Sequence, residues 1–387
     1  MNSEFKITYL LPVLFAFFVM GFCDLVGVSV TYAQAQFGWT ETQAGFLPSM
    51  VFFWFLVLSI PVAYRMNKWG RKNTVLFSMF FTFTGMILPF ILFNEIICYL
   101  SFVLLGIGNT IQQVSLNPLL TNVVSKERLT SSLTAGNFIK AISSLSGPLI
   151  AGICYSTFGR WELIFPIYAG FTLVSFFWLA STPLKQDAKS KTEASIKKTF
   201  SLLKNNQILL LFIGILAVVG LDVGLNTLAP KLLIERINLP QDIAGYGSSW
   251  YFAARTAGTF CGVFILAKTT ERAYFRINMI ICLLALVGLF FAYSHTLILV
   301  LICIIAFAAS CIFAVIFSMA LRILPDNTND ISGLMITGIS GGAIVPPLMG
   351  ITSDLVGNQN GSLLVIGVCI LYLLYCAYKI QANKTAI

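Results

Sequence analysis

Long apolar stretches alternate with short polar ones along the whole chain. A helix that crosses a lipid bilayer needs about 20 largely apolar residues, and twelve stretches have roughly that length. Their approximate bounds are 8–32, 43–63, 74–93, 97–122, 131–156, 162–181, 207–230, 244–266, 275–293, 297–321, 331–354 and 362–379. The pattern therefore predicts an all-α membrane protein with 12 transmembrane helices.

The one long polar segment separates six predicted helices from six more. It contains the lysines Lys185, Lys189, Lys191, Lys197, Lys198 and Lys204. We expect an N-terminal six-helix bundle at 1–181, a cytoplasmic linker at 182–206 and a C-terminal six-helix bundle at 207–387.

The distribution of positive charge predicts which side of the membrane each loop faces. If the N-terminus is cytoplasmic, 19 of the 24 Lys and Arg residues lie in cytoplasmic segments. Arg160, Lys231 and Arg236 then lie outside, and Lys140 and Arg255 remain within the membrane. Because cytoplasmic loops carry an excess of Lys and Arg, both termini are expected in the cytoplasm. Short loops and the lack of an organelle-targeting segment favour a bacterial inner membrane.

Composition agrees with the pattern and excludes several classes of protein. The 387 residues are 58% hydrophobic and 10% charged, whereas soluble domains average about 45–50% apolar and 25% charged residues. This excludes a cytosolic enzyme, a secreted disulfide scaffold and a nucleic-acid binder. The net charge of +9 reflects basic loops. No P-loop, cysteine pair of metal-site spacing or nucleophile–base set occurs, so we expect no ATP coupling, metal, cofactor or catalysis.

Three features recur in the two halves at one offset. Asp24 precedes Pro148 by 124 residues, and Asp222 precedes Pro347 by 125. Each acid is also followed, 135 residues later, by the glycine that ends a predicted helix. A parallel repeat of two six-helix bundles has pseudo-two-fold symmetry, and transporters built this way bind substrate between the halves near the midplane.

Several motifs carry a resemblance to a known family. The segment 67–72, with Gly70, Arg71 and Lys72, resembles the cytoplasmic loop motif of the major facilitator superfamily (MFS), with Asn67 where that motif has Asp. The segments 43–45, 117–118 and 341–354 resemble the fucose:proton symporter family. The superfamily resemblance covers essentially the whole chain, and it implies the MFS fold and alternating access. The narrower resemblance implies proton-coupled uptake of a sugar.

One departure from that narrower family concerns proton coupling. The family carries an acid on helix 4, four residues before its Asn-Pro, and this position is Gln113 here. Its helix 1 acid also lies slightly further along than Asp24. Proton coupling through that particular pair of acids is therefore not carried over.

Four charged side chains fall deep within predicted helices, where each costs about 2.5–3.5 kcal/mol on insertion scales. Burial disfavours the charged form of Asp24, which suits a proton carrier, but a permanent ion pair with Lys140 would keep it ionised. Asp222 has a nearby candidate partner in Arg255, and a structural pair is as good an interpretation as a functional one. Arg255 is also suited to an anion or a sugar hydroxyl.

Amide side chains form a polar face on helix 4. Asn109, Gln113 and Asn117 recur every four residues, with Gln112 beside them. Amides donate and accept hydrogen bonds, as a hydroxyl-rich solute requires, although they also join helices to one another. The residues expected to bind the solute are Gln112, Gln113, Asn117, Asn137, Lys140, Asn226, Tyr251 and Arg255, and those expected to couple protons are Asp24 and Asp222.

Two functional hypotheses remain open at this point. The first is a secondary transporter of a small polar solute, a sugar, by proton symport and as a monomer in the lipid bilayer. The alternative is a carrier or exporter of an organic anion, such as a carboxylate, whose charge binds Lys140 and Arg255. A membrane receptor or membrane enzyme is disfavoured, because the chain has no appended domain and no catalytic cluster.

Overall fold

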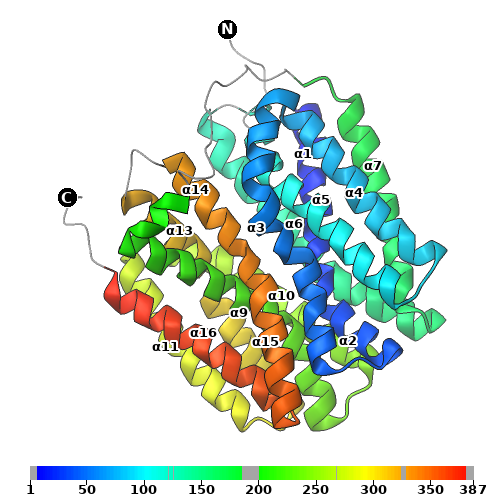
Figure 1. Cartoon of the computed structure of the whole chain (residues 1–387), viewed down its shortest axis with the longest axis vertical. Coiled ribbons are helices and arrows are strands. Elements are labelled where there is room, and N and C mark those ends of the chain that lie inside the picture. The colour runs from blue at the N-terminus through cyan, green and yellow to red at the C-terminus, as the bar shows by residue number, and fades with distance from the viewer. Residues whose placement is uncertain are drawn as a thin grey trace. The chain divides into compact units, whose positions relative to one another are not determined.

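The computed structural model describes residues 7–120, 122–124, 126–184, 200–266, 268–323 and 328–380. These residues form helices and connecting turns without a single strand, which confirms the predicted all-α class (Figure 1). Most of the linker lysines, from Lys185 to Lys198, lie outside the described residues, and Lys204 lies within them.

Every predicted span corresponds to helical structure. In the first half the helices are α1 (Ile7–Met20), α2 (Val26–Phe37), α3 (Glu41–Trp69), α4 (Arg71–Ile91), α5 (Glu95–Leu120), α6 (Lys126–Phe158) and α7 (Ile164–Ser181). In the second half they are α9 (Asn206–Ile237), α10 (Gln241–Leu266), α11 (Glu271–Phe290), α12 (His295–Ala309), α13 (Ile312–Ile323), α14 (Thr328–Thr337), α15 (Gly341–Val356) and α16 (Asn360–Lys379).

Three of the predicted spans lose regular α-helical geometry at one point, which we call a break, although each span continues as one long helix. A 3₁₀ turn at Gly21–Leu25 separates α1 from α2, and another at Gly338–Ser340 separates α14 from α15. Between α12 and α13 the helix is interrupted at residues 310–311. A 3₁₀ segment replaces the bonds of the α-helix with tighter i→i+3 bonds, and such segments within a helix often mark hinges.

Eleven of the helices within the described residues are long and apolar enough to cross a membrane. Helix α10 is not among them. It is long enough to cross a membrane, at 26 residues, but it is not apolar enough. Its sequence includes Ser248, Ser249 and Arg255, and polar residues of this kind inside a membrane mark functional helices. The predicted span at 244–266 is thus the most polar of the twelve.

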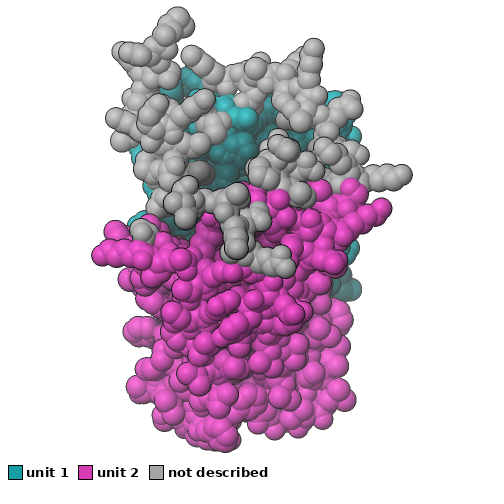
Figure 2. Space-filling view, turned by 90° about the vertical axis from the view of Figure 1, so that its left-hand side faces the viewer, with its two compact units in different colours: residues 1–29, 50–194 teal, residues 30–49, 195–387 magenta. Residues whose placement is uncertain are grey.

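The chain divides into two compact units, each of which makes most of its contacts within itself (Figure 2). The first contains residues 1–29 and 50–194, and the second contains residues 30–49 and 195–387. The second unit thus includes the end of α2 and the start of α3, which the predicted bundle boundary at 181 assigns to the first half. In the first unit, an apolar cluster that includes Phe17 of α1, Met79 of α4 and Leu116 of α5 is fully buried.

Glycines allow the helices within each unit to touch backbone to backbone. A Cβ atom at Gly106 of α5 would overlap the backbone of Val51 in α3, and one at Gly341 of α15 would overlap the backbone of Leu216 in α9. Membrane helices lack a hydrophobic driving force for association, so close van der Waals packing of this kind is a main source of their stability.

We predict that Gly341→Ala lowers the stability of the protein by about 1–3 kcal/mol, the usual cost of overpacking. Buried free thiols such as Cys98 and Cys282 become reactive on unfolding, so a thiol-reactive fluorophore reports the melting temperature. Gly170→Ala is the matched control, because nothing lies within 4 Å of the added methyl group. Equal melting temperatures for the two variants would contradict the close-packing argument.

Candidate functional site

Asp24 lies in the 3₁₀ turn that interrupts the first membrane span. Gly21, at the start of this turn, packs so closely on α6 that a Cβ atom there would overlap Ser143 and the carbonyl oxygen of Lys140. The approach brings the carboxylate of Asp24 to α6, where the hydroxyl of Ser144 lies 2.5 Å from Oδ2. The same hydroxyl lies 3.0 Å from the Lys140 carbonyl oxygen.

Ser144 is therefore able to serve two protonation states of Asp24. When the carboxylate is ionised, the hydroxyl donates to Oδ2. When the carboxyl is protonated, it donates to Ser144, whose own proton then turns to the carbonyl of Lys140, since a hydroxyl is both donor and acceptor. The contact holds the side chain in place without requiring a fixed charge.

Two residues predicted to bind the solute, Asn137 and Lys140, precede Ser144 on α6. Lys140 is half-buried and Asn137 is exposed. These three residues occupy successive turns, with Lys140 one turn before Ser144. The structure thus brings the predicted acid of helix 1 to the polar face of α6 through a serine.

The amides of α5 divide into two groups. Asn109 donates to the carbonyl of Met20 at 2.7 Å, and Gln112 donates to that of Ala16 at 2.9 Å. The two carbonyls lie four residues apart near the end of α1, and both amides are buried. They satisfy backbone acceptors beside an interrupted helix, so in this structure Asn109 and Gln112 join α5 to α1.

Gln113 and Asn117 form the second group, one helical turn apart on α5. The side-chain oxygen of Gln113 is buried and has no hydrogen-bond partner among the described residues, and Asn117 is exposed. A buried acceptor without a partner costs free energy, and a solute hydroxyl would remove that cost. The side-chain oxygens of Asn109 and Gln112 also lack a partner among the described residues, but their NH₂ groups are already bound to α1. Gln113 and Asn117 are therefore the better placed to meet a solute.

In the second unit Asp222 of α9 pairs with Arg255 of α10, with 2.9 Å between Oδ2 and Nη2. The hydroxyl of Tyr251, one turn before Arg255, donates to the other carboxylate oxygen. The two charged side chains are 28% and 36% exposed, whereas Tyr251 is buried. Three residues predicted separately therefore form one cluster.

Asn226, one turn beyond Asp222, is buried between α9 and α10. Its backbone carbonyl accepts a hydrogen bond of 3.0 Å from the hydroxyl of Ser248. On the opposite side of α9, Gly220 and Gly224 pack closely on Val345 and Met349 of α15. These glycines thus explain why α9 presents Asp222 toward α10.

The two acids of the repeat share one packing arrangement and differ in their partners. Gly21 lies three residues before Asp24 and touches α6, and Gly220 lies two residues before Asp222 and touches α15. However, Asp24 accepts a hydrogen bond from Ser144, whereas Asp222 forms an ion pair with Arg255. These two contacts thus differ in their chemistry.

The loop motif at 70–72 has a clear structural basis. Gly70, between α3 and α4, has φ of +83°, which favours glycine because a Cβ atom is strained there. Arg71 donates to the Pro118 carbonyl at 3.0 Å and to the side chain of Asn122 at 2.7 Å. Lys72 donates to two carbonyls at the end of α7. The basic residues thus satisfy free carbonyls at helix C-termini, where cations are favoured.

A polar cluster that the sequence did not reveal lies within the second unit, at the start of α3. Glu41 pairs with Lys231 of α9 at 2.5 Å and accepts from Gln34 at 2.8 Å. Asp354 of α15 accepts from the backbone amides of Glu41 and Thr42, at 3.1 and 2.8 Å. It thereby caps the N-terminus of α3 from another helix, which satisfies free N–H groups and complements the helix dipole.

The same contact explains two of the motifs that carried the family resemblance. A Cβ atom at Gly45 would overlap the backbone of Pro346, and one at Gly350 would overlap the backbone of Glu41. The segments 43–45 and 341–354 therefore pack against each other. No sequence signal links Glu41 to Lys231, because 190 residues separate them.

Comparison with known proteins identifies the family. The sequence pattern of the Major Facilitator Superfamily matches residues 13–347, and the chain belongs to this superfamily. The glucose/galactose transporter of Brucella abortus biovar 1 (strain 9-941) is 22% identical over 389 residues, covering 95% of this chain and 92% of that protein. A putative glucose/galactose transporter of Helicobacter pylori (strain J99) is 26% identical over 171 residues, covering 43% of this chain and 42% of that protein.

Solved structures of low sequence identity share the fold. A bacterial homolog of the human lysosomal transporter Spinster, inward-facing and unoccupied, has a TM-score of 0.80 at 14% identity and covers 98% of this chain and 96% of its own. The E. coli fucose:proton symporter has a TM-score of 0.69 at 18% identity, and the match covers 98% of this chain and 100% of the symporter. The nucleoside transporter NupG has a TM-score of 0.79 at 12% identity, and the match covers 96% of this chain and 98% of NupG. The predicted fold is confirmed, and the protein is a membrane transporter rather than an enzyme.

We predict that Asp222 and Arg255 stabilise the protein as a pair. Asp222→Asn and Arg255→Met each lower the melting temperature. The double variant loses less free energy of unfolding than the two single variants together. The coupling energy is of order 1 kcal/mol, because both side chains are about a third exposed. Thermal melts of the three variants in detergent measure this coupling. Strictly additive effects would show that the ion pair contributes nothing to stability.

Proposed function

We propose that this protein is a secondary transporter that moves a sugar across the membrane by alternating access, with protons as the coupling ion. The observation that carries the proposal is the contact between Asp24 and Ser144 at the break in the first span. It provides a membrane carboxyl group with a partner that suits both of its protonation states. A proton carrier needs this property, since it must load and unload in each cycle.

The sugar is supported by the chemistry of the membrane-embedded side chains. Gln113 and Asn117 offer amide donors and acceptors, and the oxygen of Gln113 lacks a partner within the described residues. Asn137, Lys140 and Tyr251 add further hydrogen-bonding groups on other helices. Hydroxyl-rich solutes require such mixed donors and acceptors. The names of the relatives, glucose/galactose transporters, point in the same direction.

The organic-anion alternative depends on membrane cations that are free to bind a charge. Arg255 is neutralised by Asp222 in this structure, which leaves Lys140 as the remaining predicted cation. An anion would thus have to compete with a carboxylate that already holds the guanidinium. The geometry supports a neutral polar solute better than a charged one.

The breaks in the helices support alternating access. The spans that contain α1 and α2, α12 and α13, and α14 and α15 each lose regular α-helical geometry at one point. A 3₁₀ segment within a helix often marks a hinge about which the helix bends. We propose two six-helix bundles, at 1–181 and 207–387, as the moving bodies, working as a monomer.

The orientation follows from the basic loops. Basic residues gather at two turns. The turn between α3 and α4 is flanked by Arg65, Lys68, Arg71 and Lys72, and the turn between α10 and α11 by Lys268 and Arg272. Lys and Arg accumulate in cytoplasmic loops. We therefore propose that both termini face the cytoplasm, in a bacterial inner membrane.

We predict that purified protein in liposomes takes up a monosaccharide against its concentration gradient when the interior is made alkaline. With one proton per solute, a difference of one pH unit sustains at most about tenfold accumulation. Uptake of a panel of radiolabelled sugars and carboxylates, with and without the pH gradient, measures this. Accumulation of carboxylates alone, or uptake that ignores the gradient, would contradict the proposal.

We predict that Asp24→Asn abolishes accumulation and retains sugar exchange between the two faces of the membrane, because the amide keeps the shape but cannot titrate. Ser144→Ala retains accumulation and shifts its dependence on pH, since it removes only the hydrogen-bond partner. Counterflow and gradient-driven uptake separate the two activities. Asp222→Asn is the matched control, and we expect it to keep accumulation. If Asp222→Asn lost accumulation and Asp24→Asn retained it in full, the coupling site would be Asp222 instead.

A further inference from the structure

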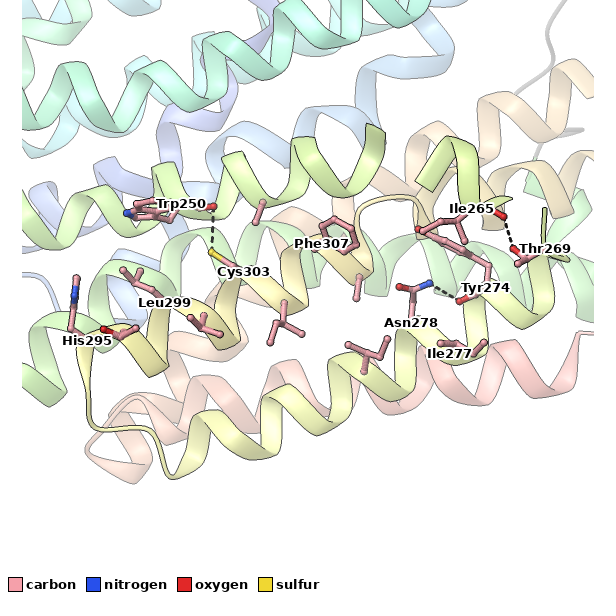
Figure 3. A pocket seen from close by; sticks show the side chains of 16 residues that line it. Trp250, Ile265, Thr269, Tyr274, Ile277, Asn278, His295, Leu299, Cys303 and Phe307 are labelled. Carbon is pink, nitrogen blue, oxygen red and sulfur yellow. Dashed lines mark hydrogen bonds between the residues drawn. The ribbon is translucent and has the colours of Figure 1, made fainter. Parts of the chain in front are cut away.

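A long apolar groove runs along the second unit between α10, α11 and α12 (Figure 3). Its volume is about 730 Å³. Helix α12 forms the floor and packs against both α10 and α11, which make few contacts with each other. The lining extends from His295, at the start of α12, to Thr269 and Tyr274, at the turn between α10 and α11. Residues 295–308 alone span about 20 Å at the rise of an α-helix.

The lining of the groove is mostly apolar, and three of its polar side chains contact backbone carbonyls. The hydroxyl of Thr269 donates to the carbonyl of Ile265 at 2.8 Å, and the amide of Asn278 donates to that of Tyr274 at 2.8 Å. The Cys303 thiol lies 3.7 Å from the carbonyl of Trp250. All three contacts are drawn in Figure 3. The groove therefore fits a hydrocarbon chain rather than a sugar.

One end of the groove carries positive charge. Lys268 is exposed beside Thr269, and Arg272 lies in the first turn of α11, two residues before Tyr274. The intervening acid, Glu271, pairs with Arg322 of α13, so it does not cancel these two cations. Near the opposite end, Arg236 lies over the ring of Tyr293 and already donates to the Ala292 carbonyl and to Asn360. We therefore assign the headgroup position to Lys268 and Arg272, at the end proposed to face the cytoplasm.

We propose that this groove binds one anionic phospholipid, with an acyl chain along α12 and the phosphate on Lys268 and Arg272. Basic pockets between membrane helices on the cytoplasmic side are suited to anionic headgroups. The surrounding medium supplies the ligand, because two helices of the groove, α11 and α12, belong to segments long and apolar enough to cross a bilayer. The site is separate from the predicted sugar-binding residues and does not depend on the identity of the solute.

Occupancy of the groove bears on the ion pair of the second unit. Trp250 and Ala254 line the groove, whereas their neighbours in sequence, Tyr251 and Arg255, contact Asp222. A lipid in the groove therefore packs on the helix that presents this cluster. We expect the bound lipid to stabilise α10 in the position seen here.

Native mass spectrometry of the full chain tests the proposal. The purified protein is titrated with phosphatidylglycerol and, separately, with phosphatidylcholine of the same acyl chains. We expect one tightly bound phosphatidylglycerol molecule. Phosphatidylcholine binds about tenfold or more weakly, and the variant Lys268→Gln/Arg272→Gln binds phosphatidylglycerol equally weakly. Ala254→Trp, which fills the groove without touching the charges, abolishes the tight adduct.

The matched control is Arg65→Gln/Lys68→Gln, which removes two basic residues near the turn between α3 and α4. It retains the tight adduct, and melting temperatures confirm that each variant is folded. Equal binding of the two lipids would overturn the headgroup assignment. A tight adduct that persists in Ala254→Trp, or is lost in the control pair, would place the lipid elsewhere. A dimer that dissociates only in Ala254→Trp would make a second copy of the chain the occupant.

Discussion

A carboxylate inside a bilayer needs a partner, and the contact of Asp24 with Ser144 is the interaction on which the proposed function depends. It exists because the first span breaks at Gly21–Leu25 and because Gly21 lets the broken helix approach α6. Asn109 and Gln112 then satisfy the carbonyls near the break. Buried amides thus bind the backbone next to the 3₁₀ segment, and the segment itself carries a titratable group.

The second half of the repeat uses the same packing for a different electrostatic purpose. Gly220 brings α9 against α15 as Gly21 brings the first span against α6. Here α9 continues without a break, and Asp222 is held by Arg255 and Tyr251. Asp222 forms an ion pair with a guanidinium, and Asp24 accepts a hydrogen bond from a hydroxyl. We propose a structural role for Asp222 and proton transfer for Asp24.

Hydropathy and spacing predicted most of the architecture, because each membrane span must itself be apolar over about 20 residues. They also placed Arg255 near Asp222. They missed the helix breaks, since a 3₁₀ turn of apolar residues has the same hydropathy as a helix. The cluster of Glu41, Lys231 and Asp354 was likewise hidden, because it joins segments far apart in sequence. Periodicity grouped Gln112 with Gln113 and did not reveal that only Gln112 donates to the backbone of α1.

The most direct test of the central claim is the protonation of Asp24 itself. Infrared difference spectra, recorded on addition of the transported sugar, detect the C=O stretch of a protonated carboxyl group. We expect a carboxyl band in the native protein and in Asp222→Asn, a band shifted in frequency in Ser144→Ala, and no band in Asp24→Asn. A band that remains unchanged in Asp24→Asn would contradict the account and show that another group carries the proton.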